Sequence, residues 1–325
     1  MADLLSRIRR RIDMTTKDFQ SDMHFSPRLA MARMCANLCG RAGLRSVAAA
    51  AGRKKEEFVH SYVSDTLAPV LERYRTDCED GTYAPDAPIW ICWWSGEETA
   101  PPIVKRCIRS IRENAGSHPV HMITADTYAE YLQIPAFMLE KVEKKQMGLA
   151  HLADYIRVKL LAEQGGLWLD ATIFCSGTVP ELCFDIPFFT CKSPRQPCGY
   201  LSEMRWVTFC LGGWKGNVFF RFLADAFERY WQVSPCAIDY LFFDNVIELA
   251  CNELPAVRRL LDAVPENNLH RDDLQAAMNA ALPASEFDSV LKPDTVLYKL
   301  SWRECYAEKT ADGRQSIFSG FVVGC

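Results

Sequence analysis

Residues 153–172 read ADYIRVKLLAEQGGLWLDAT, and their pattern indicates the fold class. Apolar side chains recur at helical spacing from Leu149 to Leu160, which predicts a helix. Gly165-Gly166 is a typical helix exit, because glycine adopts the left-handed conformation easily. The apolar run Leu167–Phe174 then predicts a buried strand. A helix that leads directly into such a strand indicates an α/β domain.

The same alternation continues on both sides of this stretch. Ile89–Trp94 and Val120–Thr124 predict two further strands, separated by a helical pattern that ends at Asn114-Ala115-Gly116. Later strands are predicted at Pro187–Cys191, Trp206–Leu211, Thr295–Leu300 and Ser316–Val323, and later helices at Asn217–Trp231, Tyr240–Asn252, Ala256–Ala263 and Arg271–Ala281. We therefore expect a mixed, mainly parallel sheet covered by helices.

The N-terminal part differs from the rest in charge. Residues 1–57 carry twelve Lys or Arg against six Asp or Glu, a net charge of +6, whereas the remainder carries −10. This part includes Arg7, Arg9, Arg10 and Arg11, and it reads as helices. Its basic side suits contact with anionic lipid or an acidic partner, and the alternative is a solvated extension packed on the main domain. We expect a helical extension over residues 1–80 and one α/β domain over residues 81–325.

Composition excludes several classes of protein. The net charge of −4 over 325 residues argues against nucleic acid as the main partner. No apolar run is long enough for a transmembrane helix, and the basic start Met1–Arg11 leads into no apolar stretch, so we expect no signal peptide. Fourteen scattered cysteines are interpreted as reduced thiols, which predicts a cytoplasmic protein.

Open parallel sheets bind ligands beyond the carboxyl ends of their strands. No Gly-x-Gly-x-x-Gly, Walker-type, Gly-x-Ser-x-Gly or His-Glu-x-x-His pattern follows a predicted strand, which argues against nicotinamide, P-loop and hydrolase chemistry. Asp154 and Arg157 lie three residues apart on one helical face, and Asp170 ends the next strand. These three side chains are expected to converge on one crevice. The alternative is a surface ion pair of a few tenths of a kcal/mol beside an aspartate that caps a turn.

The pattern Asp-x-x-Arg, Leu-rich helix, Gly-Gly-x-Trp-x-Asp resembles the donor-site segment of the capsular polysaccharide synthesis and family 32 glycosyltransferases. The resemblance extends to Ile89–Pro101, Gly212–Trp231 and Tyr298–Trp302, and covers roughly residues 86 to 320. It implies a GT-A (Rossmann-like) nucleotide-sugar-binding domain that transfers a sugar with retention at the anomeric carbon, by front-face attack and without a protein nucleophile.

The resemblance also implies roles for individual residues. Asp170 and Arg157 become the catalytic candidates, and the donor-binding candidates are Trp93, Trp94, Asp154, Gly165, Gly166, Thr172, Lys299 and Trp302. Arg157 and Lys299 would meet the charge of the leaving diphosphate, and Asp154 and Asp170 would accept hydrogen bonds from sugar hydroxyls. Trp93 or Trp94 would stack on the base, the other being a core residue, since neighbours on a strand point to opposite faces.

One departure from the wider pattern concerns metal binding. Many GT-A enzymes carry Asp-x-Asp, whereas this chain has Asp170-Ala171-Thr172. A hydroxyl is a poor substitute for a carboxylate on a hard dication. We therefore expect any Mn²⁺ or Mg²⁺ at Asp170 to be weakly held and dependent on the donor.

These expectations combine into one functional hypothesis. A retaining enzyme would transfer a hexose or N-acetylhexosamine from a nucleotide sugar, a UDP-sugar rather than a GDP-sugar, to an oligosaccharide or lipid-linked glycan. It would act in surface (capsular) polysaccharide synthesis, in the cytoplasm, peripherally at the inner face of the membrane. The alternatives are a toxin-like glycosyltransferase that modifies protein, and a degenerate module that binds nucleotide sugar without transfer.

Overall fold

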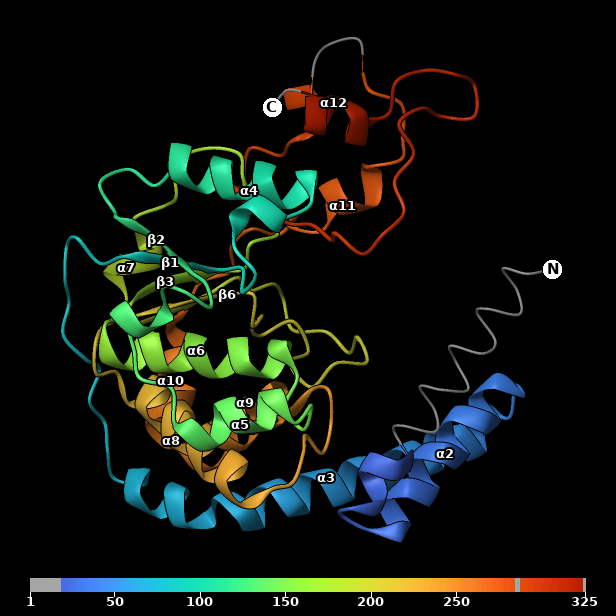
Figure 1. Cartoon of the computed structure of the whole chain (residues 1–325), viewed down its shortest axis with the longest axis vertical. Helices are drawn as coiled ribbons and strands as arrows, with labels where there is room; N and C mark the ends of the chain where they lie inside the picture. Colours follow the sequence, from blue (N-terminus) through green and yellow to red (C-terminus); the bar gives the residue numbers. More distant parts are fainter. Residues whose placement is uncertain (1–18, 284–286, 324–325) are drawn as a thin grey trace.

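The computed structural model describes residues 19–283 and 287–323 (Figure 1), so the predicted arginine cluster Arg7–Arg11 lies outside the described residues. Its main sheet has the order β2-β1-β3-β6-β5. The strands are β1 (Ile89–Cys92), β2 (Val120–Ile123), β3 (Gly166–Leu169), β5 (Phe188–Thr190) and β6 (Cys210–Gly213). β1 pairs in parallel with β2 and β3, and β6 is antiparallel to both β3 and β5. Four of the five strands therefore share one direction, which confirms the mixed, mainly parallel sheet.

Helices cover both faces of this sheet (Figure 1). On one side lie α4 (Pro102–Glu113), α11 (Asp273–Ala277) and α12 (Ile317–Val323). On the other side lie α5 (Ala136–Glu143), α6 (Leu149–Glu163), α8 (Val218–Val233), α9 (Phe242–Glu253) and α10 (Pro255–Ala263). The short helix α7 (Leu182–Asp185) lies beside the sheet. None of the helices that the structure describes has the length and apolar character needed to cross a membrane.

The alternation of side chains along each strand divides the core into two apolar clusters. Ile89 and Ile91 of β1 pack into the cluster that contains α4, while Trp90 lies in the cluster that contains α6 and α8. Leu167 and Trp168 of β3 separate in the same way. The sheet is therefore buried on both faces, as expected for parallel strands.

The predicted N-terminal helices are α2 (Pro27–Arg41) and α3 (Arg45–Tyr74). Ser26 caps α2 by accepting a hydrogen bond from the Arg28 N–H. The later part of α3 packs on α8 and α9, and Val63 and Leu67 belong to the same buried cluster as those helices. Figure 1 shows α2 farther from the sheet, beyond the end of α3 that starts at Arg45.

Two predicted strands are wrong in whole or in part. Leu167–Phe174 is not one strand, because the chain turns at Asp170 and continues as β4 (Ile173–Cys175), which pairs with β7 (Leu297–Lys299) in a separate two-stranded sheet. Ser316–Val323 is mostly the helix α12, in which the Ser316 hydroxyl accepts a hydrogen bond from the Ser319 N–H in the first turn. An apolar run alone does not distinguish these cases.

Two other predicted elements are displaced or shortened. The strand expected at Trp206–Leu211 is β6, which begins only at Cys210. Before it, the backbone of Val207 is hydrogen-bonded to the Thr190 hydroxyl and not to a neighbouring strand: the hydroxyl accepts from the Val207 N–H and donates to the Val207 carbonyl. The helix expected at Arg271–Ala281 is limited to α11.

Candidate active site

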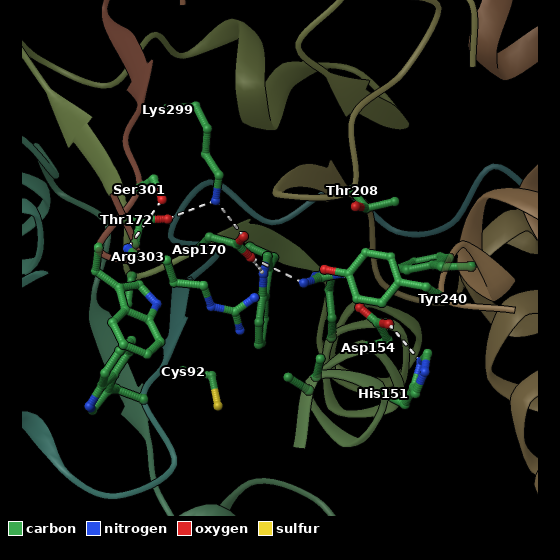
Figure 2. A pocket seen from close by; sticks show the side chains of 18 of the residues that line it. Cys92, His151, Asp154, Asp170, Thr172, Thr208, Tyr240, Lys299, Ser301 and Arg303 are labelled. Atoms are coloured by element: carbon green, nitrogen blue, oxygen red, sulfur yellow. Dashed lines mark hydrogen bonds and ion pairs between the residues drawn. The ribbon is translucent and has the colours of Figure 1, made fainter. Parts of the chain in front are cut away.

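A cleft of about 420 Å³ lies beyond the carboxyl ends of β1 and β3 (Figure 2). Its walls come from the end of β1, α6, the turn after β3, the start of α9 and the chain that follows β7. The carboxyl ends of the two parallel strands thus lie at the same cleft, which is where open α/β sheets bind their ligands.

Asp170 lies at the centre of a polar cluster in this cleft. Its Oδ1 accepts hydrogen bonds from Arg157 Nη2 at 3.1 Å and Trp168 Nε1 at 3.0 Å. Its Oδ2 accepts one from Lys299 Nζ at 2.8 Å, and the same ammonium donates to Thr172 Oγ1 at 2.7 Å. The turn that breaks the predicted strand therefore places a carboxylate and a hydroxyl around one ammonium group.

Arg157 connects the helix to this turn. Its guanidinium donates from Nη1 to Asp154 Oδ1 at 2.7 Å while Nη2 reaches Asp170. The side chain is only 6% exposed and lies over the ring of Trp168, 4.9 Å from its centroid. The convergence expected from the sequence is therefore observed, and a simple surface ion pair is excluded, because one buried fork bridges two carboxylates.

The carboxyl groups of the cleft differ in their affinity for protons. Burial disfavours the charge of Asp170, but Lys299 and Arg157 outweigh it and hold the pKa of that carboxyl below its usual value. Burial raises the pKa of Asp244, and the nearby Asp154 adds to this, although Trp206 Nε1 donates to Asp244 at 2.9 Å. Burial also raises the pKa of the Cys92 thiol to about 12. A cysteine thiolate is therefore not available as a nucleophile in this cleft at neutral pH.

The residues present do not fit a resident divalent cation. Among the residues that the structure describes, no group of three or more His, Cys, Asp or Glu side chains is arranged to hold a metal ion. Both oxygens of Asp170 already accept from cationic groups, and Lys299 also takes the Thr172 hydroxyl. Hard dications favour several oxygen ligands, so most of the ligands would have to come from a bound donor.

The predicted aromatic residues separate into two groups. Trp93 and Trp302 both line the cleft and meet edge to face, with ring centroids 5.7 Å apart. Trp94 instead stacks on Tyr128, 5.5 Å away, and does not line the cleft. The expectation that only one of Trp93 and Trp94 faces the site is met, and that residue is Trp93.

Gly165 and Gly166 are not part of the cleft, which corrects their assignment as donor-binding residues. They lie at the start of β3, at the opposite end of the strand from Asp170, and have φ angles of 71° and 98°. A Cβ on Gly166 would lie 2.2 Å from the carbonyl oxygen of Pro88. These glycines therefore form the tight turn between α6 and β3, which positions Asp170 only indirectly.

Several residues that line the cleft belong to no recognisable motif and were not predicted as site residues from the sequence. Asp244, Tyr240 and Thr208 come from irregular or distant segments, and nothing in their local pattern marks them. His151 had a signal, because it lies three residues before Asp154 on a predicted helix. Its Nδ1 is 3.7 Å from Asp154 Oδ2.

Comparison with known proteins places the chain in a family. Residues 45–320 match the family described as capsular polysaccharide synthesis protein, and the chain belongs to that family. This confirms the resemblance seen in the sequence. The shared region begins earlier than the resemblance indicated, at the first residue of α3.

Two individual proteins are also similar. The O-glycosyltransferase braB of Annulohypoxylon truncatum is 27% identical over 162 residues, which cover 45% of this chain and 38% of that protein. The match thus spans about two fifths of the relative's length. The solved structure PaToxG Glycosyltransferase aligns with 73% of this chain and 94% of its own, at a TM-score of 0.31 and 13% identity.

Proposed function

We propose that this protein is a retaining glycosyltransferase of the GT-A type, which transfers a hexose or N-acetylhexosamine from a nucleotide sugar. The observation that carries the proposal is the cluster of Asp170, Arg157 and Lys299 beyond the carboxyl ends of parallel strands. Membership of the capsular polysaccharide synthesis family supports it, as does the partial similarity to a protein named an O-glycosyltransferase.

The leaving nucleoside diphosphate gains negative charge as the glycosidic bond breaks, so a preset positive charge lowers the barrier. Lys299 is the group that contacts it, because its side chain is 26% exposed and its ammonium uses two of its three N–H bonds for Asp170 and Thr172. Arg157 is more deeply buried and acts mainly by holding Asp154 and Asp170 in place. These carboxylates then accept hydrogen bonds from donor hydroxyls, while Trp93 and Trp302 offer rings for the base.

Retention without a protein nucleophile is consistent with these surroundings. Asp154 and Asp170 are both bound by Arg157, and the Cys92 thiol stays protonated at neutral pH. Direct attack of the acceptor hydroxyl on the same face as the leaving group requires none of them as a nucleophile. We extend the proposal to a UDP-sugar as donor and to an oligosaccharide or lipid-linked glycan as acceptor, in surface polysaccharide synthesis.

We further propose that the enzyme is cytoplasmic and is held peripherally at the inner face of the membrane, and the exposed side chains of the N-terminal helices support the attachment. Four apolar side chains on α2, the turn after it and the start of α3 are strongly exposed: Met31 (63%), Leu38 (52%), Leu44 (54%) and Val47 (47%). Basic residues lie beside them: Arg28, Arg41 and Arg45. Apolar side chains flanked by arginine on a helical hairpin fit an anionic lipid surface.

A panel of UDP- and GDP-sugars, each with and without Mn²⁺, tests the proposal by thermal unfolding. A ligand at a hundred times its dissociation constant adds about 2.7 kcal/mol to the free energy of unfolding. We expect a UDP-sugar to give the largest shift and Mn²⁺ to add little. The absence of a shift with every nucleotide sugar would contradict the donor site. Hydrolysis and acceptor screening then separate glycan transfer from protein modification and from binding alone.

A further inference from the structure

A second, larger cavity of about 710 Å³ adjoins the cleft. It lies between α3, the segment 195–205 and α9. Leu241 lines both hollows, with Tyr240 on the cleft side and Asp239 on the side of the second cavity. The cleft and the second cavity therefore share a wall made by the consecutive residues Asp239, Tyr240 and Leu241. A ligand bound in the cleft would therefore lie close to a ligand bound in the second cavity.

The charges of the second cavity do not suit an anionic ligand. Five acidic residues line it, Glu56, Glu57, Glu203, Asp239 and Glu248, against three basic ones, Lys55, Arg195 and Arg205, a balance of −2. Each basic group already forms an ion pair with one of these carboxylates: Lys55 with Asp239 at 2.9 Å, Arg195 with Glu203 at 2.6 Å and Arg205 with Glu248 at 2.7 Å. A phosphate or carboxylate would meet excess negative charge. A neutral ligand with many hydroxyl groups would instead find carboxylate acceptors.

Exposed aromatic rings lie on both sides of the shared wall. Tyr200, in the second cavity, is 62% exposed, and Tyr240, in the cleft, is 73% exposed. Figure 2 shows Tyr240 at the same side of the cleft as Asp154 and His151. Tyrosine combines a flat apolar face with a polar tip, which matches a sugar ring that has C–H groups on its faces and hydroxyls around its edge.

The loop that carries Tyr200 is held in a strained form. Glu203 and Met204 are consecutive non-glycine residues with φ angles of 45° and 70°. The Ser193 N–H donates to the Met204 carbonyl at 3.1 Å, and the buried Arg271 fixes Ser193 through its hydroxyl at 2.6 Å. Such strain persists only where the surroundings impose it, and it concentrates at ligand sites.

The opposite wall is also fixed from a distance. Asp239 accepts from the Leu241 N–H at 2.9 Å and forms ion pairs with Lys55 of α3 at 2.9 Å and Arg33 of α2 at 3.3 Å. The N-terminal helices thereby fix the position of the wall that the cleft and the second cavity share.

We propose that the second cavity is the acceptor site and that it binds a neutral oligosaccharide, with Tyr200 as the stacking platform and the reacting end of the chain beyond Leu241 in the cleft. This inference rests on the proposed function. In the transfer, the acceptor hydroxyl oxygen forms a bond to the anomeric carbon, the bond from that carbon to the diphosphate oxygen breaks, and the hydroxyl proton passes to the departing phosphate.

The test is binding of the full chain, with UDP present, to immobilised neutral and anionic oligosaccharides. We expect the wild type to bind neutral chains, Tyr200→Ala to bind them about tenfold more weakly and Tyr200→Phe to bind them nearly as well, because the ring remains. Tyr83→Ala, at an exposed tyrosine outside both cavities, is the matched control and should bind as wild type does.

Thermal shifts with nucleotide sugars, recorded on the same variants, separate the two proposals. Unchanged shifts together with selective loss of glycan binding in Tyr200→Ala support the acceptor site. Three results would overturn the acceptor site and leave the donor site standing, provided that the shifts are present. They are no binding of any neutral glycan, binding of anionic glycans only, and binding of neutral glycans by Tyr200→Ala as strong as that of the wild type. If the shifts are absent, the proposed function itself fails.

Discussion

Lys299 Nζ lies 2.8 Å from Asp170 Oδ2, although the two residues are 129 positions apart in the chain. The contact exists because β7 pairs with β4 directly after the turn at Asp170, with Ile173 opposite Lys299. The C-terminal part of the chain thus supplies the ammonium group that pairs with Asp170. The proposed donor site is therefore complete only when the small second sheet has formed.

The charge of Asp170 makes part of the stability dependent on pH. Because its pKa is lowered in the folded state, the stabilisation is fully present above the unfolded value of about 3.9 and is lost as pH falls through the folded value. Asp170→Asn should therefore unfold more easily than wild type at pH 7, with the difference shrinking below about pH 4. Urea unfolding across this range measures it, and a difference that is independent of pH would contradict the assignment.

Arg157 should not be replaceable by lysine. Its fork reaches Asp154 and Asp170 together, whereas an ammonium offers a single point of contact. We expect Arg157→Lys to lower kcat/KM by at least about tenfold, roughly 1.4 kcal/mol, and Arg157→Gln to lower it further. Arg106→Lys is the matched control, since that arginine also lies over an aromatic ring, Phe174, but outside the cleft. Equal rates in Arg157→Lys and wild type would remove the bridge from the mechanism.

Loss of Lys299 should cost more activity than loss of metal. Its ammonium is already in place beside Asp170 and Thr172, whereas a weakly held ion must be recruited with the donor. Turnover of Lys299→Gln is compared with wild type in EDTA, and Lys144→Gln, at an exposed ion pair, serves as the control. Complete loss with EDTA together with a near-normal rate in Lys299→Gln would overturn this ranking.

Membrane attachment is better tested by point changes than by deletion of residues 1–57. Such a deletion also removes Arg33 and Lys55, which hold Asp239 in the wall between the cleft and the second cavity. A variant with Leu38→Ser, Leu44→Ser and Arg41→Gln should lose flotation with anionic vesicles, each basic residue contributing about 1 kcal/mol near the surface. High salt should weaken binding of the wild type. Unchanged flotation of the variant, relative to Arg73→Gln at the far end of α3, would exclude this surface.

Local patterns predicted the parts of the fold that depend on local chemistry. Helical spacing and the glycines at the helix exit predicted α6 and the start of β3. The three-residue spacing of Asp154 and Arg157 predicted that these two residues of the polar cluster lie together. The break at Asp170 was not visible, because apolar residues continue on both sides and the turn is stabilised by Lys299 from a distant strand. Asp244 and Tyr240 were missed for the same reason, since only tertiary packing brings the start of α9 to the cleft.

Release of nucleoside diphosphate from UDP-sugars, measured for wild type and Asp170→Asn side by side, tests whether the cleft around Asp170 is the donor site of a glycosyltransferase. We expect release from at least one UDP-sugar by the wild type, and a rate at least about tenfold lower in the variant, equivalent to roughly 1.4 kcal/mol of transition-state stabilisation. Circular dichroism confirms that the variant is folded at the assay pH. No release from any nucleotide sugar, or an unchanged rate in a folded Asp170→Asn, would contradict this assignment.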